Sequence, residues 1–286
     1  MVKLCAFADE SSPTLEGQIN ALKRNGISLI EVRTINGKNI ADFTIEEAKN
    51  YKKAFEENGI YVWSLGSPLG KVDISVDFND YTNILRHVCE LANVFNSKYI
   101  RIFSFFNAYD KENVVYDYLN KMVEISNEYG VKLCHENEKE IFGDTAERVL
   151  KIANNVKGLN FIYDPANYLQ CGEPADKTLE LFHKSSVYFH IKDVIVDTDE
   201  LVPAGCGDGK ISKLIELIDD DKVLTLEPHL ALFQAFNSFD NTEMKHKYEF
   251  KSAEEAFDFA VISLKNLLKD AGYIENKGEF IKWNLV

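Results

Sequence analysis

Residues 131–137, with the sequence VKLCHEN, set the interpretation of the whole chain. The stretch begins as a short apolar run of β-forming residues and ends on His135, Glu136 and Asn137, with no turn residue in between. An unpaired carboxylate inside a strand would cost several kcal/mol of folding free energy. We therefore expect Glu136 to lie at the end of a buried strand, where another group compensates its charge.

Three later segments repeat this pattern. The run FIYD ends at Asp164, VYFH ends at His190 and VLTLE ends at Glu227. Four successive apolar strands are therefore expected to present one Glu, Asp or His each at the C-terminal end. This shared position makes Glu136, Asp164, His190 and Glu227 the candidate centre of the protein.

Apolar strand patterns and amphipathic helix patterns alternate along the chain, at intervals of roughly 30 residues, as expected of βαβ units. Thr44 and Glu47 form the pattern of a capping box at the start of the second helix, and Gly59 follows its end. The expected strands are residues 3–8, 27–32, 60–65, 99–103, 131–137, 160–163, 187–189 and 222–226, and the expected helices are residues 14–25, 44–58, 80–95, 111–129, 144–155, 175–183, 211–218 and 252–271.

Eight such units are the signature of a (β/α)8 barrel, a fold that commonly has about 250 residues in one domain. An open doubly wound sheet is the alternative, and it often carries a glycine-rich first turn. The first turn here, residues 8–12, reads ADESS and contains no glycine. We predict an α/β protein with a single (β/α)8 TIM barrel in one domain, residues 1–286. The tail 272–286 is expected to pack Phe280 and Trp283 on the barrel or on a partner subunit of a homo-oligomer.

The composition limits the classes of partner. The chain has 286 residues, of which 45% are hydrophobic, and its 46 acidic residues outnumber 32 basic ones for a formal net charge of −14. An acidic protein repels a phosphate backbone, so we expect no nucleic-acid partner. The five cysteines form no CxxC pair and are expected to be buried, reduced thiols. No signal-peptide pattern and no apolar run of the ~18 residues that a membrane span needs are present, so we expect a cytoplasmic protein without membrane contact.

The strand-end residues suit a divalent metal ion. In a barrel the carboxyl ends of the strands meet on one face, so Glu136, Asp164, His190 and Glu227 should form an arc around a common point. Three carboxylates in a small space repel one another unless they are protonated or neutralised. A divalent cation such as Mn, Mg, Co or Zn suits a set of two Glu, one Asp and one His. The alternative is that a helix N-terminus or an arginine compensates each residue separately.

At these residues the sequence resembles the xylose isomerase-like TIM-barrel superfamily, and within it the branch of sugar and sugar-phosphate isomerases and epimerases. The resemblance extends from the first strand to the last helix. Its motifs are Glu136-Asn137, Asp164, His190-Ile191-Lys192-Asp193, Glu227, Gly66-Ser67-Pro68 and Arg101. One departure is Asn167, where many members have a histidine three residues after the strand-six Asp. An asparagine can donate a hydrogen bond to substrate but cannot be protonated, so Asn167 is a candidate substrate contact without a role in proton transfer.

The resemblance implies a metal-dependent isomerase or epimerase of a small carbohydrate. The metal would act as a Lewis acid on a hydroxy-ketone and stabilise an enediolate. Glu136 and Glu227 would move protons as general acid and base. Return of the proton on the opposite face gives epimerisation, whereas return to the neighbouring carbon gives isomerisation. Asp164 and His190 would be ligands only, and His190 would keep its other ring nitrogen on a further partner.

Other residues near the strand ends have more than one interpretation. Arg101 and Lys192 are expected to bind a substrate hydroxyl, carboxylate or phosphate, or to pair with the excess carboxylates. Glu31 and Arg33 end the second strand and are expected to pair with each other. The loop 205–210, GCGDGK, is expected to be a plain flexible loop in preference to an anion-binding loop.

Two other activities are compatible with the same fold. An inosose-type dehydratase would expel water from the enediolate instead of reprotonating it. An endonuclease IV-like phosphodiesterase would need several histidine ligands and a basic rim for DNA. One well-placed histidine and a net charge of −14 disfavour the phosphodiesterase. No nicotinamide-binding fingerprint is present to suggest hydride transfer to a cofactor.

Overall fold

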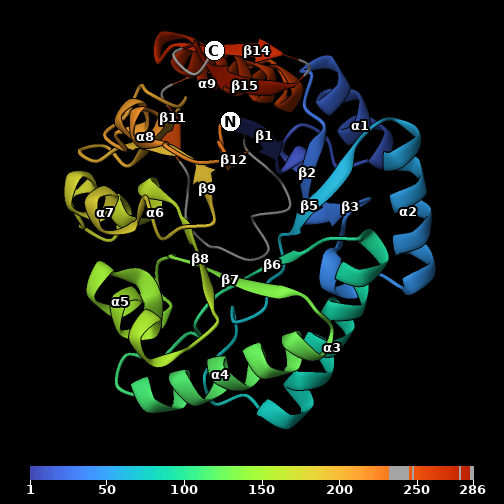
Figure 1. Ribbon diagram of the computed structural model, residues 1–286, viewed down its shortest axis with the longest axis vertical. Coiled ribbons are helices and arrows are strands. Elements are labelled where there is room, and N and C mark those ends of the chain that lie inside the picture. The colour runs from blue at the N-terminus through green and yellow to red at the C-terminus, as the bar shows by residue number, and fades with distance from the viewer. Residues whose placement is uncertain (232–244, 247, 277, 284–286) are drawn as a thin grey trace.

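The computed structural model describes residues 1–231, 245–246, 248–276 and 278–283. In this part of the chain eight parallel strands follow one another around a barrel, which closes because β1 pairs with both β2 and β12 (Figure 1). The predicted (β/α)8 barrel is therefore confirmed. Its strands are β1 (Val2–Ala6), β2 (Leu29–Val32), β5 (Tyr61–Leu65), β6 (Tyr99–Ile102), β7 (Lys132–Glu136), β8 (Asn160–Tyr163), β9 (Tyr188–Ile191) and β12 (Lys222–Leu226).

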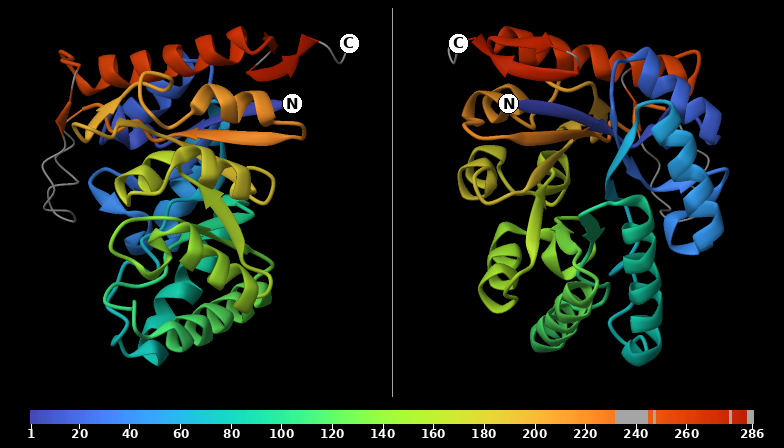
Figure 2. Two further views of the ribbon diagram at one scale, coloured as in Figure 1. Left: turned by 90° about the vertical axis from the view of Figure 1, so that its left-hand side faces the viewer. Right: turned by 45° about the vertical axis from the view of Figure 1, so that its right-hand side comes forward.

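The helices surround this ring of strands (Figures 1 and 2). The predicted capping box is present at the start of α2, because the Thr44 hydroxyl accepts the Glu47 N–H (3.1 Å) and the Glu47 carboxylate accepts the Thr44 N–H (2.7 Å). No helix in the described ranges combines the length and the apolar character needed to cross a membrane. The helices are α1 (Leu15–Arg24), α2 (Ile45–Glu57), α3 (Phe78–Phe95), α4 (Glu112–Glu128), α5 (Ala146–Asn155), α6 (Pro165–Gln170), α7 (Ala175–Phe182), α8 (Ile211–Leu217) and α9 (Ala253–Asp270).

Apolar side chains fill the barrel on both sides of the strands. Because side chains alternate along a strand, every second residue points inward. Cys5, Cys134, Ile162, Tyr188 and Val223, each from a different strand, form one buried cluster. A larger cluster lies between strands and helices. All five cysteines are free thiols, but the expectation that they are buried holds only for Cys5, Cys89 and Cys134, because Cys171 is half-buried and Cys206 is exposed.

The short helix α6 was not among the predicted elements. It begins directly after Asp164, whose carboxylate accepts the Asn167 N–H at 3.0 Å and thereby caps the helix. Pro165 occupies the first helical position, where its missing N–H costs no hydrogen bond. The Asp-Pro pair was thus the sequence signal for this helix.

The C-terminal tail extends the sheet beside β1. The strands β14 (Tyr273–Asn276) and β15 (Glu279–Lys282) form a hairpin, and β15 pairs antiparallel with β1. Phe280 is buried and packs on the barrel as predicted, whereas 67% of Trp283 is exposed. The remaining short elements are β3 (Thr34–Ile35), β4 (Lys38–Asn39), β10 (Asp193–Ile195), β11 (Glu200–Val202), β13 (Lys245–His246) and the 3-10 turns η1 (Ala8–Glu10), η2 (Ile40–Asp42) and η3 (Phe142–Asp144).

Candidate metal centre

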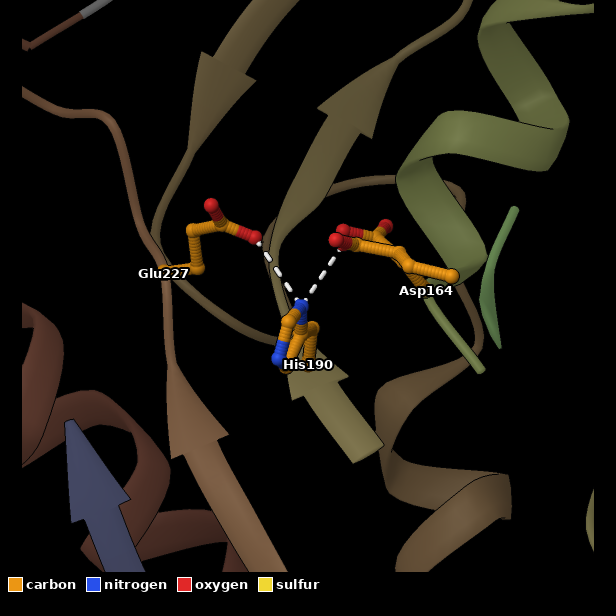
Figure 3. A group of neighbouring side chains, drawn as sticks. Asp164, His190 and Glu227 are labelled. Carbon is orange, nitrogen blue, oxygen red and sulfur yellow. Dashed lines mark hydrogen bonds and ion pairs between the residues drawn. The ribbon is translucent and has the colours of Figure 1, made fainter. Parts of the chain in front are cut away.

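The four strand-end residues meet at one point. Glu136 ends β7, Asp164 follows β8, His190 lies in β9 and Glu227 follows β12. Figure 3 shows Asp164, His190 and Glu227 directed toward one another. Each of the four residues offers one ligand atom, and these atoms all lie within 4.8 Å of one another. All four side chains are buried. The convergence predicted from the strand ends is therefore what the fold produces.

His190 stands between the two glutamates. Its Nδ1 lies 2.7 Å from Glu136 Oε1 and 3.2 Å from Glu227 Oε2. Its Nε2 lies 3.2 Å from Glu31 Oε2, on the other side of the ring. Burial lowers the pKa of His190, but the Glu136 and Glu31 carboxylates outweigh it and hold the pKa well above the usual value. The surrounding carboxylates therefore stabilise a positive charge on the His190 ring.

Buried cations also contact the carboxylates. Arg101 Nη1 lies 3.2 Å from Glu136 Oε2 and 3.6 Å from Glu227 Oε1. The Arg101 guanidinium stacks over the rings of Phe7 and Phe103, at 5.0 and 4.9 Å from the ring centroids. Part of the negative charge is thus balanced within the protein, as the alternative of separate compensation required.

Lys192 balances a third carboxylate. Its Nζ lies 3.1 Å from Asp164 Oδ2. Burial raises the pKa of Asp164 to about 6, although the Lys192 ammonium opposes this shift. For Glu227, burial acts in the same upward direction, but Lys192 and His190 outweigh it and hold the pKa well below its usual value. Carboxylates with such different environments are suited to different chemical tasks.

The three carboxylates retain capacity for a metal ion. Glu136 Oε2, Asp164 Oδ2 and Glu227 Oε2 are buried and take part in no hydrogen bond with the described residues. Their nearest cationic nitrogens, at 3.1 to 3.2 Å, form ion pairs without hydrogen-bond geometry. Three such oxygens and one imidazole are ligands that Mn, Co or Zn accept, and oxygen ligands also suit Mg. The residues present therefore fit a divalent cation.

Asn167 contributes to the scaffold of the site. Its side-chain amide donates to the Asn137 carbonyl at 2.9 Å. Asn137 in turn exchanges two hydrogen bonds with the Asp164 backbone, at 2.9 and 3.0 Å. These contacts tie the end of β7 to the end of β8 and fix the positions of two candidate ligands. A substrate contact through Asn167 stays a prediction.

The expected pairing of Glu31 with Arg33 is replaced by other partners. The Arg33 guanidinium donates two hydrogen bonds to Asp9, both at 2.8 Å, and one to Glu227 Oε1 at 3.1 Å. Arg33 Nη2 also lies 3.4 Å from Glu10 Oε1. Glu10 Oε2 accepts the backbone N–H of His229. Residues two apart in a regular strand point to the same side, so Glu31 and Arg33 would be expected side by side. However, β2 ends at Val32, between the two residues, and their side chains reach different partners. Sequence reasoning had no local signal for the Asp9 contact.

The backbone of the loop after β11 binds the carboxylate of Asp193. The Asp193 carboxylate accepts the backbone N–H groups of Gly205 (2.8 Å), Gly207 (3.0 Å) and Gly209 (2.8 Å), and that of Val194 (3.0 Å). Residues 205–209 are called the glycine loop below. A Cβ atom on Gly207 would lie 2.5 Å from Asp193 Oδ1, so only glycine fits there. The expectation of a plain flexible loop was therefore wrong.

The fold and the strand-end cluster define an α/β barrel with an acidic and histidine centre at the carboxyl ends of its strands. Comparison with protein families matches residues 19–242 to the family described as Xylose isomerase-like TIM barrel. The chain belongs to this family, as the sequence motifs indicated. No curated protein matches the sequence of the chain.

Solved structures with the same fold include enzymes of two kinds. One is a probable 3-DHS dehydratase, AsbF, from Bacillus anthracis (TM-score 0.71, 15% identity, 93% of this chain and 99% of that chain covered). Another is the IOLI protein with a bound zinc atom (TM-score 0.65, 21% identity, 94% and 97% covered). A third is a D-allulose 3-epimerase from Methylomonas sp. (TM-score 0.71, 11% identity, 93% and 98% covered). At these identities the likeness shows the fold.

Proposed function

We propose that the chain, acting as one domain of residues 1–286, is a divalent-metal-dependent isomerase or epimerase of a small sugar, sugar phosphate or polyol ketone. The observation that carries the proposal is a set of three buried carboxylates, each with one oxygen that takes part in no hydrogen bond, whose ligand atoms lie within 4.8 Å of one another and of a His190 nitrogen. The zinc atom in the IOLI structure and the activity named for D-allulose 3-epimerase, two proteins of the same fold, support it.

Glu136, Asp164, His190 and Glu227 would hold the metal ion. When bound, the ion would supply Lewis-acid polarisation of the substrate carbonyl. Glu136 and Glu227 both lie beside His190 Nδ1, at 2.7 and 3.2 Å, so both carboxylates would be close to a substrate carbon bound at this point. One of them would take the proton beside the carbonyl, and the other would return a proton on the opposite face. Arg101 contacts both glutamates, at 3.2 Å from Glu136 and 3.6 Å from Glu227, and would hold them in place.

Metal binding is tested first, in the absence of substrate. We expect elemental analysis to find one divalent cation per chain after dialysis against metal and removal of the excess. Asp164→Asn and His190→Asn should lower this stoichiometry at a fixed free metal concentration, because each removes one ligand. Asp176→Asn, which changes an exposed aspartate paired with Lys213, is the matched control. Retention of full stoichiometry in both ligand variants would overturn the assignment of the site.

The reaction class is tested by exchange with solvent. Proton transfer through a carboxylic acid on the enzyme allows that proton to exchange with water before it returns. Incubation in D₂O with metal and a panel of free and phosphorylated ketoses should therefore place deuterium beside the carbonyl of the accepted substrate. Loss of water would identify a dehydratase instead. Interconversion without deuterium would indicate a hydride shift and would exclude Glu136 and Glu227 as proton carriers.

A further inference from the structure

Glu31 is a buried carboxylate that lies against the candidate metal centre. It belongs to β2 and has no exposed surface. The register between β2 and β5 shifts after Ile30, so that Glu31 pairs with Ser64 where an unbroken ladder would pair it with Trp63. A β-bulge changes the direction of the side chains beside it. Here the shift accompanies a Glu31 side chain that reaches His190 inside the barrel.

Four groups from three other strands fix the orientation of the Glu31 carboxylate. Its Oε1 accepts hydrogen bonds from the hydroxyls of Ser64 (3.2 Å) and Tyr188 (3.1 Å). Its Oε2 accepts one from the Thr225 hydroxyl (3.3 Å) and lies 3.2 Å from His190 Nε2. Both oxygens are therefore held by two groups each. A carboxylate that is bound on all sides in this way cannot rotate to serve as a mobile proton carrier, but it can fix a neighbouring ring.

The His190 imidazole has two different sides. Nδ1 faces Glu136 and Glu227, whereas Nε2 faces Glu31. The rings of Phe7 and Tyr188 contact the imidazole edge-on, with centroid distances of 5.2 and 5.5 Å. Packing thus restrains the plane of the ring, but an imidazole flipped by 180° would occupy nearly the same volume. Only the polar partners distinguish the two orientations.

We propose that Glu31 is a positioning residue of the metal centre: its carboxylate accepts the Nε2–H of His190 and so directs Nδ1 toward the metal ion. The proposal rests on the metal site proposed above. Metal-bound histidines generally donate their second ring N–H to a carboxylate or carbonyl, and loss of that partner typically lowers metal affinity by ~10–100-fold. Glu31 is suited to this role because the hydroxyls of Ser64, Tyr188 and Thr225 fix its carboxylate.

The variant Glu31→Gln tests the proposal, because it keeps the size of the side chain and removes the charge. Zinc affinity would be measured by competition with a chromophoric chelator, without substrate. We expect a loss of ~10–100-fold relative to wild type. Tyr188→Phe and Thr225→Val are matched controls, since each removes one hydrogen bond to the same carboxylate and leaves the His190 contact in place. They should change zinc affinity by less than about threefold.

A second measurement needs no variant at Glu31 to fold. In the zinc-loaded wild-type protein labelled with ¹⁵N-histidine, His190 should show a low-field Nε2 proton and a metal-shifted Nδ1. Nitrogens in the reverse roles would overturn the proposal. So would a Glu31→Gln protein whose zinc affinity equals that of wild type, or equal losses in all three variants, which would indicate a purely structural role. These outcomes leave the metal site intact, whereas wild-type protein that binds no zinc would overturn the metal site and this inference together.

Discussion

Replacing Asp193 by alanine tests how far the glycine loop depends on one carboxylate. In the wild-type chain that carboxylate accepts four backbone N–H groups at 2.8 to 3.0 Å and is almost completely buried. The glycine loop leads into α8. Lys192, the residue directly before Asp193, contacts Asp164 in the candidate site. The change should therefore affect both the stability of the barrel and the position of one cation.

The size of the effect follows from the two kinds of N–H group that lose their acceptor. The groups of Val194 and Gly209 are buried, and an unsatisfied buried donor costs ~1–3 kcal/mol. Those of Gly205 and Gly207 are partly exposed and can bind water instead, so their loss costs less. Removal of the buried Asp193 charge offsets part of this loss of unfolding free energy, because burying that charge was itself unfavourable. We expect a net loss of roughly 3 kcal/mol, which for a chain of this size lowers the melting temperature by roughly 6–12 °C.

Thermal unfolding followed by circular dichroism measures the global effect, and hydrogen exchange of the peptide that spans the glycine loop measures the local one. The matched control is Asp208→Ala in the same loop, because the Asp208 side chain is exposed and accepts a single N–H, that of Val196 (2.9 Å). We expect a loss of less than ~1 kcal/mol for the control. Equal melting temperatures for the two variants, together with unchanged exchange in the loop, would refute the reasoning about the Asp193 carboxylate.

Two further predictions concern the site and the thiols. Glu136→Gln and Glu227→Gln should each lower turnover by ~10²–10⁴ even at saturating metal, as expected for loss of a general acid or base, and recovery of near-wild-type turnover in both would contradict their assignment. Cys206 is exposed, whereas burial raises the pKa of the Cys89 thiol to about 12. A thiol reagent at pH 8 should therefore label Cys206 in the native protein, while Cys89 should be labelled only after denaturation, as peptide mass spectrometry would show.

The regular part of the fold was predictable because its signals are local. Apolar runs of strand length and amphipathic runs of helix length alternate eight times, and the capping box at Thr44 and Glu47 located the start of α2 to the residue. The helix α6 was missed because its six residues, Pro165–Gln170, are too few for an amphipathic repeat. Its signal lies in the capping pair Asp164-Pro165, where Asp164 both follows a strand and caps a helix.

The candidate site was predictable as far as chain geometry determines it. A strand-end carboxylate in each of several barrel strands has to face the same opening, so the convergence of Glu136, Asp164 and Glu227 followed from their positions. The partners of Arg33 did not follow, because Asp9 and Glu227 are far from it in sequence and their distances depend on the closed barrel. The contacts of Glu31 were not predictable either, because the direction of its side chain depends on a register shift that no residue pattern in β2 indicates.

The glycine loop also bears on the recognition of phosphate groups. In many barrels of this class the loops after the seventh and eighth strands bind the phosphate of the substrate through backbone N–H groups. Here the segment after the seventh barrel strand, β9, already directs the N–H groups of Gly205, Gly207 and Gly209 to Asp193. A phosphate at that position would have to displace a fixed carboxylate and would be repelled by its charge. These three N–H groups are therefore already bound to a carboxylate of the protein and do not form a ready phosphate site.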